Sequence, residues 1–321
     1  MVKLTRRIPE TEPVRDFSPQ EFYDKRNTIL IIRYAGGFGD ILMQRFMFED
    51  FKALHPDLKI HYACPPKYHD IVRDHPFIDC LLDCFTVDPK QYLVSYDIST
   101  ACLRYEVSHY PNCSKHRADI WAEHCGVQLI HHNHYLTAAE EDKAHARTLL
   151  APYKRPIALI CPVSAMPIRT LPMQTVAQAA DALRQAGCTV LAYHSDPVPE
   201  IIKMGIPMIT DLTLLQIIGL ISEVDYVVST DTAHFHIAGI LGKPMTGIFS
   251  VTNGKVYGKY FDKFVLVQKH RDNGDWDCGP CYDWCRCPKS QALPRPCATE
   301  VTQDMVSQGI RKMLQQWPIT H

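Results

Sequence analysis

The stretch RYAGGFGDILMQRF, residues 33–46, places three glycines and an aspartate where the apolar run TILIIRY gives way to a helical pattern. A strand, a glycine turn and a helix in this order are typical of a doubly wound α/β sheet. The turn matches neither phosphate-binding motif, because Leu42 replaces the third glycine of G-x-G-x-x-G and the Gly-Lys-Ser/Thr of a Walker loop is absent. Asp40 would also repel a phosphate. The sequence therefore predicts that the start of this helix presents the carboxylate of Asp40 and does not bind a phosphate.

Apolar runs and helical patterns alternate on both sides of this stretch, as expected for parallel strands covered by helices. In the first half we expect strands at 28–34, 58–64, 78–84 and 92–98, and helices at 41–54, 67–74 and 116–125. After a helical connector at 138–150, we expect strands at 157–162, 188–195, 208–212, 225–230 and 245–250, and helices at 172–186, 214–222 and 234–241. The pattern predicts two doubly wound halves, residues 28–150 and 151–321, with a ligand cleft between the carboxyl ends of their strands.

The composition fits a two-domain globular protein. The chain has 321 residues, 46% of them hydrophobic, and 34 Lys and Arg against 35 Asp and Glu give a formal charge of -1. No long block of like charge is present, so a nucleic-acid partner is possible but not favoured. No apolar stretch reaches the roughly 18 residues of a membrane span. Residues 1–27 form a polar extension without the apolar centre of a signal peptide, and we expect a cytoplasmic location.

Asp40 has two interpretations. The simpler one is that it caps its helix, a common role that contributes about 0.5 to 2 kcal/mol. The alternative is that the helix dipole holds Asp40 ionised at the mouth of the cleft, where glycines such as Gly37 leave room for a substrate. A carboxylate held in this way could take a proton from an acceptor hydroxyl.

The segment STDTAHFHIAGILGKPMTGIF, residues 229–249, indicates a phosphate site in the second half. Asp231, Thr232 and Ala233 lie where a strand runs into a helix, so that backbone amides and a hydroxyl can face a diphosphate. The alternative is that Asp231 and Thr232 only cap the helix. Two histidines crowded into the same turn favour the phosphate site.

Arg169 lies in the loop CPVSAMPIRTLP, residues 161–172, which also follows an expected strand. A single arginine in a loop is usually solvated. At this edge of the cleft, however, it is the one strong positive group, and its guanidinium could hold a departing phosphate through two hydrogen bonds.

Five of the thirteen cysteines are clustered in the pattern C-x2-C-x3-C-x-C-x9-C, within residues 278–297. Thiols this close together in a reducing compartment favour tetrahedral metal coordination over chance. The expected ligands are Cys278, Cys281 and Cys297, with Cys285 or Cys287 as the fourth, and four thiolates suit zinc or iron. Such a closed site would be structural.

These segments together resemble glycosyltransferase family nine, the heptosyltransferase family, over about residues 28–312. The most specific parts are Gly39-Asp40-Ile41-Leu42 and the run from Asp231 to Ala238 with Leu241-Gly242-Lys243-Pro244. Two positions depart from the family pattern. Ala233 replaces a glycine and Arg169 replaces a lysine, so we expect a donor pocket of altered shape.

The resemblance implies a GT-B fold with two Rossmann-like domains and inverting sugar transfer without a catalytic divalent metal. Asp40 would be the general base, Arg169, Thr232 and Ala233 would hold the diphosphate, and His236 would lie near it. Leu212 and Thr213 are weaker candidates for the nucleotide base, and Asp196 and Glu200 for the ribose.

The first half should hold the acceptor. A loop within residues 102–121 supplies four polar candidates for an anionic or sugar acceptor: Arg104, Glu106, Lys115 and Arg117. The alternative is that these side chains are solvated, as polar loop residues usually are.

The leading hypothesis is a glycosyltransferase that moves a sugar, most simply heptose from ADP-heptose, to a hydroxyl of a glycan or a protein. A second hypothesis keeps the fold with another nucleotide sugar, or with a modified nucleic-acid base as acceptor. A third is a non-catalytic nucleotide-binding module in which Asp40 is only a cap. The sequence does not determine the oligomeric state.

Overall fold

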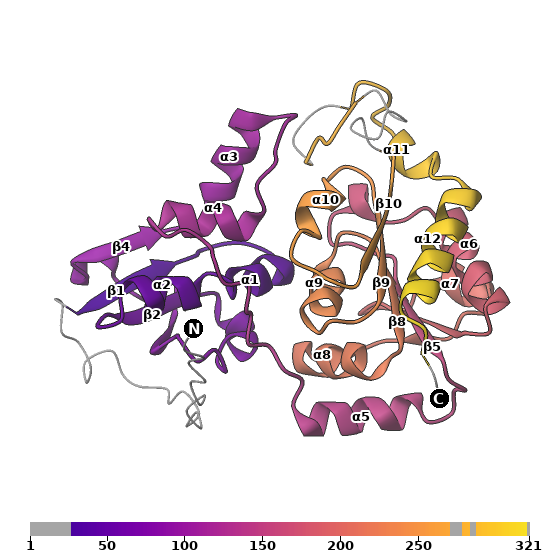
Figure 1. Cartoon of the computed structure of the whole chain (residues 1–321), viewed down its shortest axis with the longest axis horizontal. Helices are drawn as coiled ribbons and strands as arrows, with labels where there is room; N and C mark the ends of the chain where they lie inside the picture. Colours follow the sequence, from indigo (N-terminus) through magenta and orange to yellow (C-terminus); the bar gives the residue numbers. More distant parts are fainter. Residues whose placement is uncertain (1–26, 270–277, 283–286, 320–321) are drawn as a thin grey trace, which may run out of the picture.

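The computed structural model describes residues 27–269, 278–282 and 287–319, and over these residues the chain contains two parallel β-sheets, one in each half (Figure 1). The first has four strands in the order β3-β2-β1-β4: β1 (Thr28–Ile32), β2 (Lys59–Cys64), β3 (Cys80–Asp83) and β4 (Val94–Asp97). The second has six strands in the order β10-β9-β8-β5-β6-β7: β5 (Ile157–Cys161), β6 (Thr189–Tyr193), β7 (Met208–Ile209), β8 (Tyr226–Ser229), β9 (Met245–Phe249) and β10 (Phe264–Gln268). All pairings are parallel, which confirms the expected α/β class.

Helices connect the strands in both halves. The first half contains α1 (Phe38–Gln44), α2 (Phe48–Leu54), α3 (Ala101–His109) and α4 (Arg117–His124). The second contains α6 (Met173–Gln185), α7 (Pro199–Lys203), α8 (Leu214–Glu223), α9 (Ala233–Ile240), α10 (Gly254–Tyr257), α11 (Pro296–Thr299) and α12 (Gln303–Gln316). Short 3₁₀ turns lie at Pro66–Ile71, Pro89–Gln91 and Pro167–Arg169.

The central strands are buried on both faces, which explains their continuous apolar sequences. All five residues of β1, TILII, and all five of β5, IALIC, are buried. One face of the second sheet is covered by α6 and α12, whose apolar residues share a core with β5 and β6. The other face is covered by α8 and α9, and its core continues without a break into the first half. The halves therefore touch through apolar side chains as well as polar ones.

The connector helix α5 (Glu140–Leu150) lies beside α8 of the second half (Figure 1). The two helices approach so closely that a Cβ at Gly219 would lie 2.5 Å from the carbonyl oxygen of Asp142. Only glycine avoids this overlap, so Gly219 permits the close packing of the connector onto the second half.

The structure corrects three local expectations in the first half. The helix expected at 41–54 is split into α1 and α2, because the chain turns at Arg45, whose fully buried guanidinium donates to the carbonyl oxygens of Ile71, His134 and Tyr135. The helix expected at 67–74 is a 3₁₀ turn that follows Pro65 and Pro66. The loop expected within 102–121 contains α3, whose exposed and apolar residues do not separate into clear faces.

Among the described residues, the apolar pattern also does not predict five further elements: α7, α10, β10, α11 and α12. Residues 1–26, which make up nearly all of the polar extension, lie outside the described residues.

Candidate functional site

A cavity of about 290 Å³ lies between the two halves and is lined by residues from both. The first half contributes six residues, namely Gly37, Phe38, Gly39, Asp40 and Met43 from α1 with its preceding turn, and Arg117 from α4. The second half contributes the loops after β5, β6 and β8, and Tyr257 from α10. These loops are at the carboxyl ends of their strands, where open α/β sheets bind ligands.

Asp40 enters this cavity from the first turn of α1, and three donors hold its carboxylate. Oδ2 accepts hydrogen bonds from Arg33 Nη2 at 2.9 Å and from the Gly37 amide at 3.2 Å, and Oδ1 accepts one from Arg117 Nη1 at 2.8 Å. Burial on its own raises the pKa of the Asp40 carboxyl, but Arg117 and Arg33 outweigh it and lower the pKa to about 2. Asp40 is therefore ionised at neutral pH, and it binds two guanidinium groups in addition to its capping contact with the Gly37 amide.

The strand β8 leads into the turn that was expected to hold a diphosphate. In the structure the Asp231 carboxylate does not face the cavity as a free anion. Its Oδ2 accepts hydrogen bonds from Arg169 Nη1 at 3.1 Å and from Thr252 Oγ1 at 2.8 Å. Asp231 thus fixes the orientation of Arg169, which keeps about a fifth of its side-chain surface exposed for a ligand.

The start of α9 supplies backbone donors to the same cavity. Thr232 is the N-cap residue, but its side chain makes no capping hydrogen bond and instead contacts Ser229 Oγ at 3.2 Å and His234 Nδ1 at 3.1 Å. The amides at the first turn of a helix carry partial positive charge and suit an anion. Thr232, Ala233 and His234 all line the cavity, so an anion there would meet this helix end.

His236 and Gly39 bring the two halves together at the floor of the cavity. A Cβ at Gly39 would lie 2.9 Å from His236 Cδ2 and 3.5 Å from the Ala233 backbone, so α1 and α9 are nearly in backbone contact. Burial lowers the pKa of His236 to about 4, so its ring is neutral at pH 7. The glycine before Asp40 is therefore needed for close approach across the cleft.

The structure separates the four polar residues that were expected to bind an acceptor. Glu106 is buried and Arg117 lies at the cavity, where they pair with each other through Arg117 Nε and Glu106 Oε1 at 2.7 Å. Arg104 is exposed, and Lys115 pairs with Glu123 at 2.5 Å, so neither faces the cavity.

The four weak candidates for the nucleotide do not line the cavity either: Leu212, Thr213, Asp196 and Glu200. Thr213 caps α8 through a reciprocal hydrogen-bond pair with Gln216.

The sequence prediction missed three residues that line the cavity and one that lies behind it. Tyr257 lines the cavity from the second half, and His194 and Ser195 begin the loop after β6. Arg33 does not line the cavity but donates to Asp40. The two residues after β6 could have been predicted from the sequence, since polar residues directly after a parallel strand lie at the edge of the sheet where ligands bind. No local pattern marks Arg33 or Tyr257, because their roles depend on contacts made by the fold.

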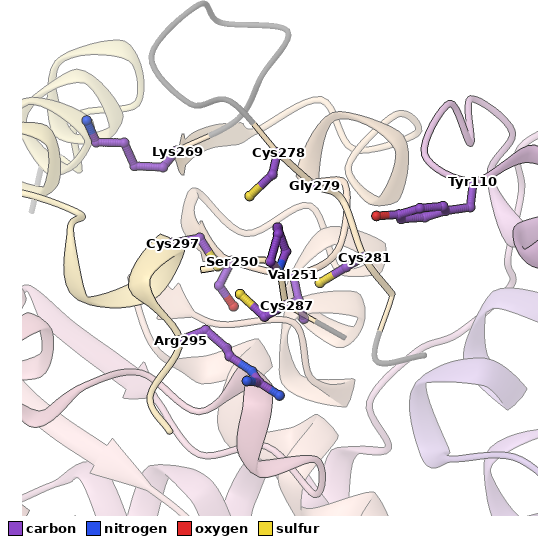
Figure 2. A pocket seen from close by; sticks show the side chains of 11 residues that line it. Tyr110, Ser250, Val251, Lys269, Cys278, Gly279, Cys281, Cys287, Arg295 and Cys297 are labelled. Carbon is purple, nitrogen blue, oxygen red and sulfur yellow. The ribbon is translucent and has the colours of Figure 1, made fainter. Parts of the chain in front are cut away.

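A second cavity, of about 20 Å³, is lined by Cys278, Cys281, Cys287 and Cys297, and Figure 2 shows these side chains arranged around one space. Burial, followed by the nearby thiols of the other three, raises the pKa of Cys297 to about 12. Among the described residues, no three His, Cys, Asp or Glu side chains are arranged to hold a metal ion as they stand. Cys285 lies outside the described residues.

The segment that carries the first of these cysteines is bound to the loop after β9. The amides of Cys281 and Tyr282 both donate to the carbonyl oxygen of Val251, at 2.9 and 3.0 Å. Thr252, the next residue, donates to Asp231. The cysteine cavity and the Arg169–Asp231 pair are thus linked through one short loop.

The sequence contains one Asp-x-Asp triplet, Asp275-Trp276-Asp277, a pattern that could bind a catalytic metal ion. The triplet lies outside the described residues, so metal-independent catalysis stays a prediction. Within the described part of the chain, no helix is both long enough and apolar enough to cross a membrane.

Comparison with known proteins identifies the relatives of this chain. The sequence model of glycosyltransferase family 9 (heptosyltransferase) matches residues 103–275, whereas no curated protein sequence matches. Among solved structures, E. coli ADP-heptose LPS heptosyltransferase II matches with TM-score 0.64 and 14% identity over 90% of this chain and 99% of that one. A glycosyltransferase family 9 protein from Veillonella parvula matches with TM-score 0.68 and 14% identity over 90% and 97%. The dodecameric, iron-containing heptosyltransferase TibC of enterotoxigenic E. coli, in complex with ADP-D-β-D-heptose, matches with TM-score 0.67 and 13% identity over 91% and 76%.

Proposed function

The chain belongs to glycosyltransferase family 9 and has its GT-B fold, and on that premise we propose that it transfers heptose from ADP-heptose to a hydroxyl of a glycan or a protein. Family membership makes it a glycosyltransferase. The choice of heptose and ADP is supported by the names of the structural relatives, one of which was solved with ADP-D-β-D-heptose bound. We also propose the division into an acceptor domain, residues 28–150, and a donor domain, residues 151–321.

The main support for this proposal is that a negatively charged group and a positively charged group line the same cavity from opposite halves. An ionised carboxylate, Asp40, enters from the first half, and a guanidinium with a helix start, Arg169 and α9, enters from the second. An inverting displacement needs both: a proton acceptor on one side of the anomeric carbon and a site for the leaving diphosphate on the other.

In the proposed reaction the acceptor oxygen attacks the anomeric carbon and the bond from that carbon to the diphosphate breaks, which releases ADP. The acceptor proton passes to an oxygen of Asp40. A carboxyl with pKa about 2 is a weak base, so this transfer must come late, when the attacking oxygen has become strongly acidic. Arg169 and the first amides of α9 hold the charge that develops on ADP.

Arg169 would be oriented for this task by Asp231 and Thr252. His236, neutral at pH 7, can donate or accept a hydrogen bond beside the sugar without adding charge. Ala233 and Gly37 would line the space for donor and acceptor.

We further propose that the cysteine cavity holds one structural zinc or iron ion. Four thiols match the number of ligands that such an ion takes, and sulfur is a soft donor that zinc and iron accept. The space between the thiols, about 20 Å³, is large enough for one ion. Cys278, Cys281, Cys287 and Cys297 would supply the thiolates, with Cys285 as the alternative fourth ligand. The ion would stabilise the loop that fixes Asp231, and it would not take part in the reaction.

Thermal denaturation in the presence of ADP-heptose, GDP-, UDP- and CMP-sugars tests the proposed donor. A ligand that binds only the folded chain raises the melting temperature, by an amount that grows with concentration over Kd. We expect ADP-heptose to give the largest shift, and Arg169→Ala to lose most of it. A larger shift from another nucleotide sugar, or equal shifts in parent and Arg169→Ala, would contradict the assignment.

A further inference from the structure

Arg117 is fixed by two carboxylates on different elements. Its guanidinium binds Glu106 of α3 through Nε at 2.7 Å and Nη2 at 3.1 Å, and it binds Asp40 of α1 through Nη1 at 2.8 Å. Glu106 is only 3% exposed, so this pair is held inside the first half. The bidentate contact with Glu106 sets the plane of the guanidinium, which leaves one edge for Asp40.

The remaining contact of this guanidinium comes from the opposite half. Tyr257, the last residue of α10, is 3% exposed, and its ring centroid lies 5.6 Å from Arg117 Cζ. A cation within about 6 Å of a tyrosine ring is attracted to it, more strongly where water is excluded. The ring of Tyr257 also lies 6.0 Å from that of His236, beside the diphosphate turn. Tyr257 therefore contacts Arg117 of the acceptor side from a position within the donor side.

The charge of Asp40 depends on few neighbours. The groups that interact with it electrostatically come from five elements: Arg33 after β1, Arg117 on α4, His236 on α9, Cys102 on α3 and Tyr62 on β2. Burial lowers the pKa of His236 and raises those of Cys102 and Tyr62, so these three are neutral at pH 7. Arg117, Arg33 and the amide of Gly37 offset the burial of Asp40, and Arg117 has the largest effect of the three.

We propose that Arg117 is a positioning residue for the transfer reaction and that Tyr257 holds its guanidinium beside Asp40 from the opposite half. Contact between the two halves then sets how closely the guanidinium of Arg117 is held to Asp40, and with it the orientation and the pKa of that carboxylate. This assignment rests on the proposed function, since it treats Asp40 as the base. The coupling itself is a property of the folded chain and can be measured without turnover.

Titration of the Asp40 carboxyl carbon by NMR, on protein labelled with ¹³C at aspartate side chains, tests the coupling directly. The Asp40 signal is identified by its absence from Asp40→Asn. In the parent we expect a midpoint at about 2, so that the signal does not move between pH 7 and pH 4. In Arg117→Gln we expect the midpoint to rise to or above the ordinary value of 3.8, because burial is then opposed only by Arg33 and the Gly37 amide. In Tyr257→Leu, where Arg117 keeps its charge and its contact with Glu106, we expect a smaller rise.

Three companion variants make the result specific. Tyr257→Phe keeps the ring and should titrate like the parent, and Arg117→Lys keeps the charge without the planar fork and should give an intermediate midpoint. Arg184→Gln, an exposed arginine on α6, should leave the Asp40 signal unchanged. The double variant of Arg117→Gln and Tyr257→Leu should match Arg117→Gln, since the tyrosine acts through the arginine.

A midpoint that stays at the parent value in Arg117→Gln or in Tyr257→Leu would overturn the proposal, and so would equal and additive shifts in the double variant. Failure of the proposed function would be recognised separately, as folded parent protein whose melting temperature no nucleotide sugar raises. In that case the titration result would still decide whether Tyr257 and Arg117 control the charge of Asp40.

Discussion

At the residue scale, the balance of charge at Asp40 decides what this side chain can do. A carboxylate with two guanidinium partners is ionised under all ordinary conditions, but it binds protons weakly. It is suited to orient an acceptor hydroxyl and to receive its proton late, and it is not suited to remove a proton from a free alcohol. The same partners make Asp40 a stabilising residue of the fold.

This stabilisation predicts a specific dependence on pH. The pKa of Asp40 is lowered from 3.8 to about 2 in the folded chain, so its contribution is complete above pH 3.8 and is lost as the pH falls toward 2. We expect the stability difference between the parent and Asp40→Asn to be about 1 kcal/mol smaller at pH 3 than at pH 6. Urea unfolding of both proteins at the two pH values measures it, and equal differences would contradict the assigned pKa.

The sequence located Asp40 but not its partners, for a physical reason. A strand, glycines and a helix are local features, so the turn that presents Asp40 can be read from consecutive residues. Arg33 looks like the end of a strand, and Glu106 and Arg117 look like polar residues of an exposed loop. Their true partners are set by packing between distant segments, which no spacing in the sequence encodes.

At the element scale, the contact between α1 and α9 explains the glycine at position 39. We expect Gly39→Ala to destabilise the chain, because the new methyl group would meet His236 Cδ2 at 2.9 Å. Helix propensity alone predicts that Gly39→Ala stabilises the chain, since alanine is more favourable than glycine in a helix by up to about 1 kcal/mol. Gly37→Ser is the matched control, because a Cβ at Gly37 meets nothing within 4 Å and serine is a good N-cap. Stabilisation by Gly39→Ala in thermal unfolding would show that the helices are not in this contact.

The cysteine segment is the second element with a testable role. We expect the purified chain to contain about one tightly bound Zn or Fe, and Cys297→Ser to lose the metal and to melt at a lower temperature. Cys188→Ser, a buried thiol outside the cavity, is the control that should keep the metal even if it lowers stability. Elemental analysis of all three proteins provides the measurement. A parent chain that is free of metal and fully stable would refute the site.

Most elements could be predicted from the sequence because they obey one rule of burial. Strands that are covered on both faces read as apolar runs, and the long helices beside them show a clear apolar face. The failures have local causes. Between α1 and α2 the amides of Arg45, Phe46 and Met47 donate to carbonyl groups three residues earlier, a local tightening that the apolar pattern does not reveal. Helix α3 has no clear apolar face, so its pattern resembles a loop.

At the scale of the whole molecule, the two halves are joined by contacts outside the cavity that contains Asp40 as well as within it. Tyr260 of the second half donates a hydrogen bond to Asp119 of α4, and the neighbouring Lys259 donates to both Tyr260 and Asp119. The ring of Tyr260 stacks on that of His132, between α4 and α5, with the centroids 4.0 Å apart. Together with the continuous apolar core, these contacts hold the cleft in a state where Asp40 and Arg169 share one space. The family match covers residues 103–275 and so confirms the resemblance of the motif within residues 231–244, whereas the motif at residues 39–42 lies outside that match. The structural relatives confirm the fold.

If Asp40 and the turn at residues 231–233 act together in sugar transfer, release of ADP from ADP-heptose should depend on Asp40. We expect the parent to release ADP, Asp40→Asn to release it at least about 100-fold more slowly, and ADP to raise the melting temperature of both proteins equally. Equal rates of release in the parent and Asp40→Asn, with nucleotide binding intact, would contradict this joint action.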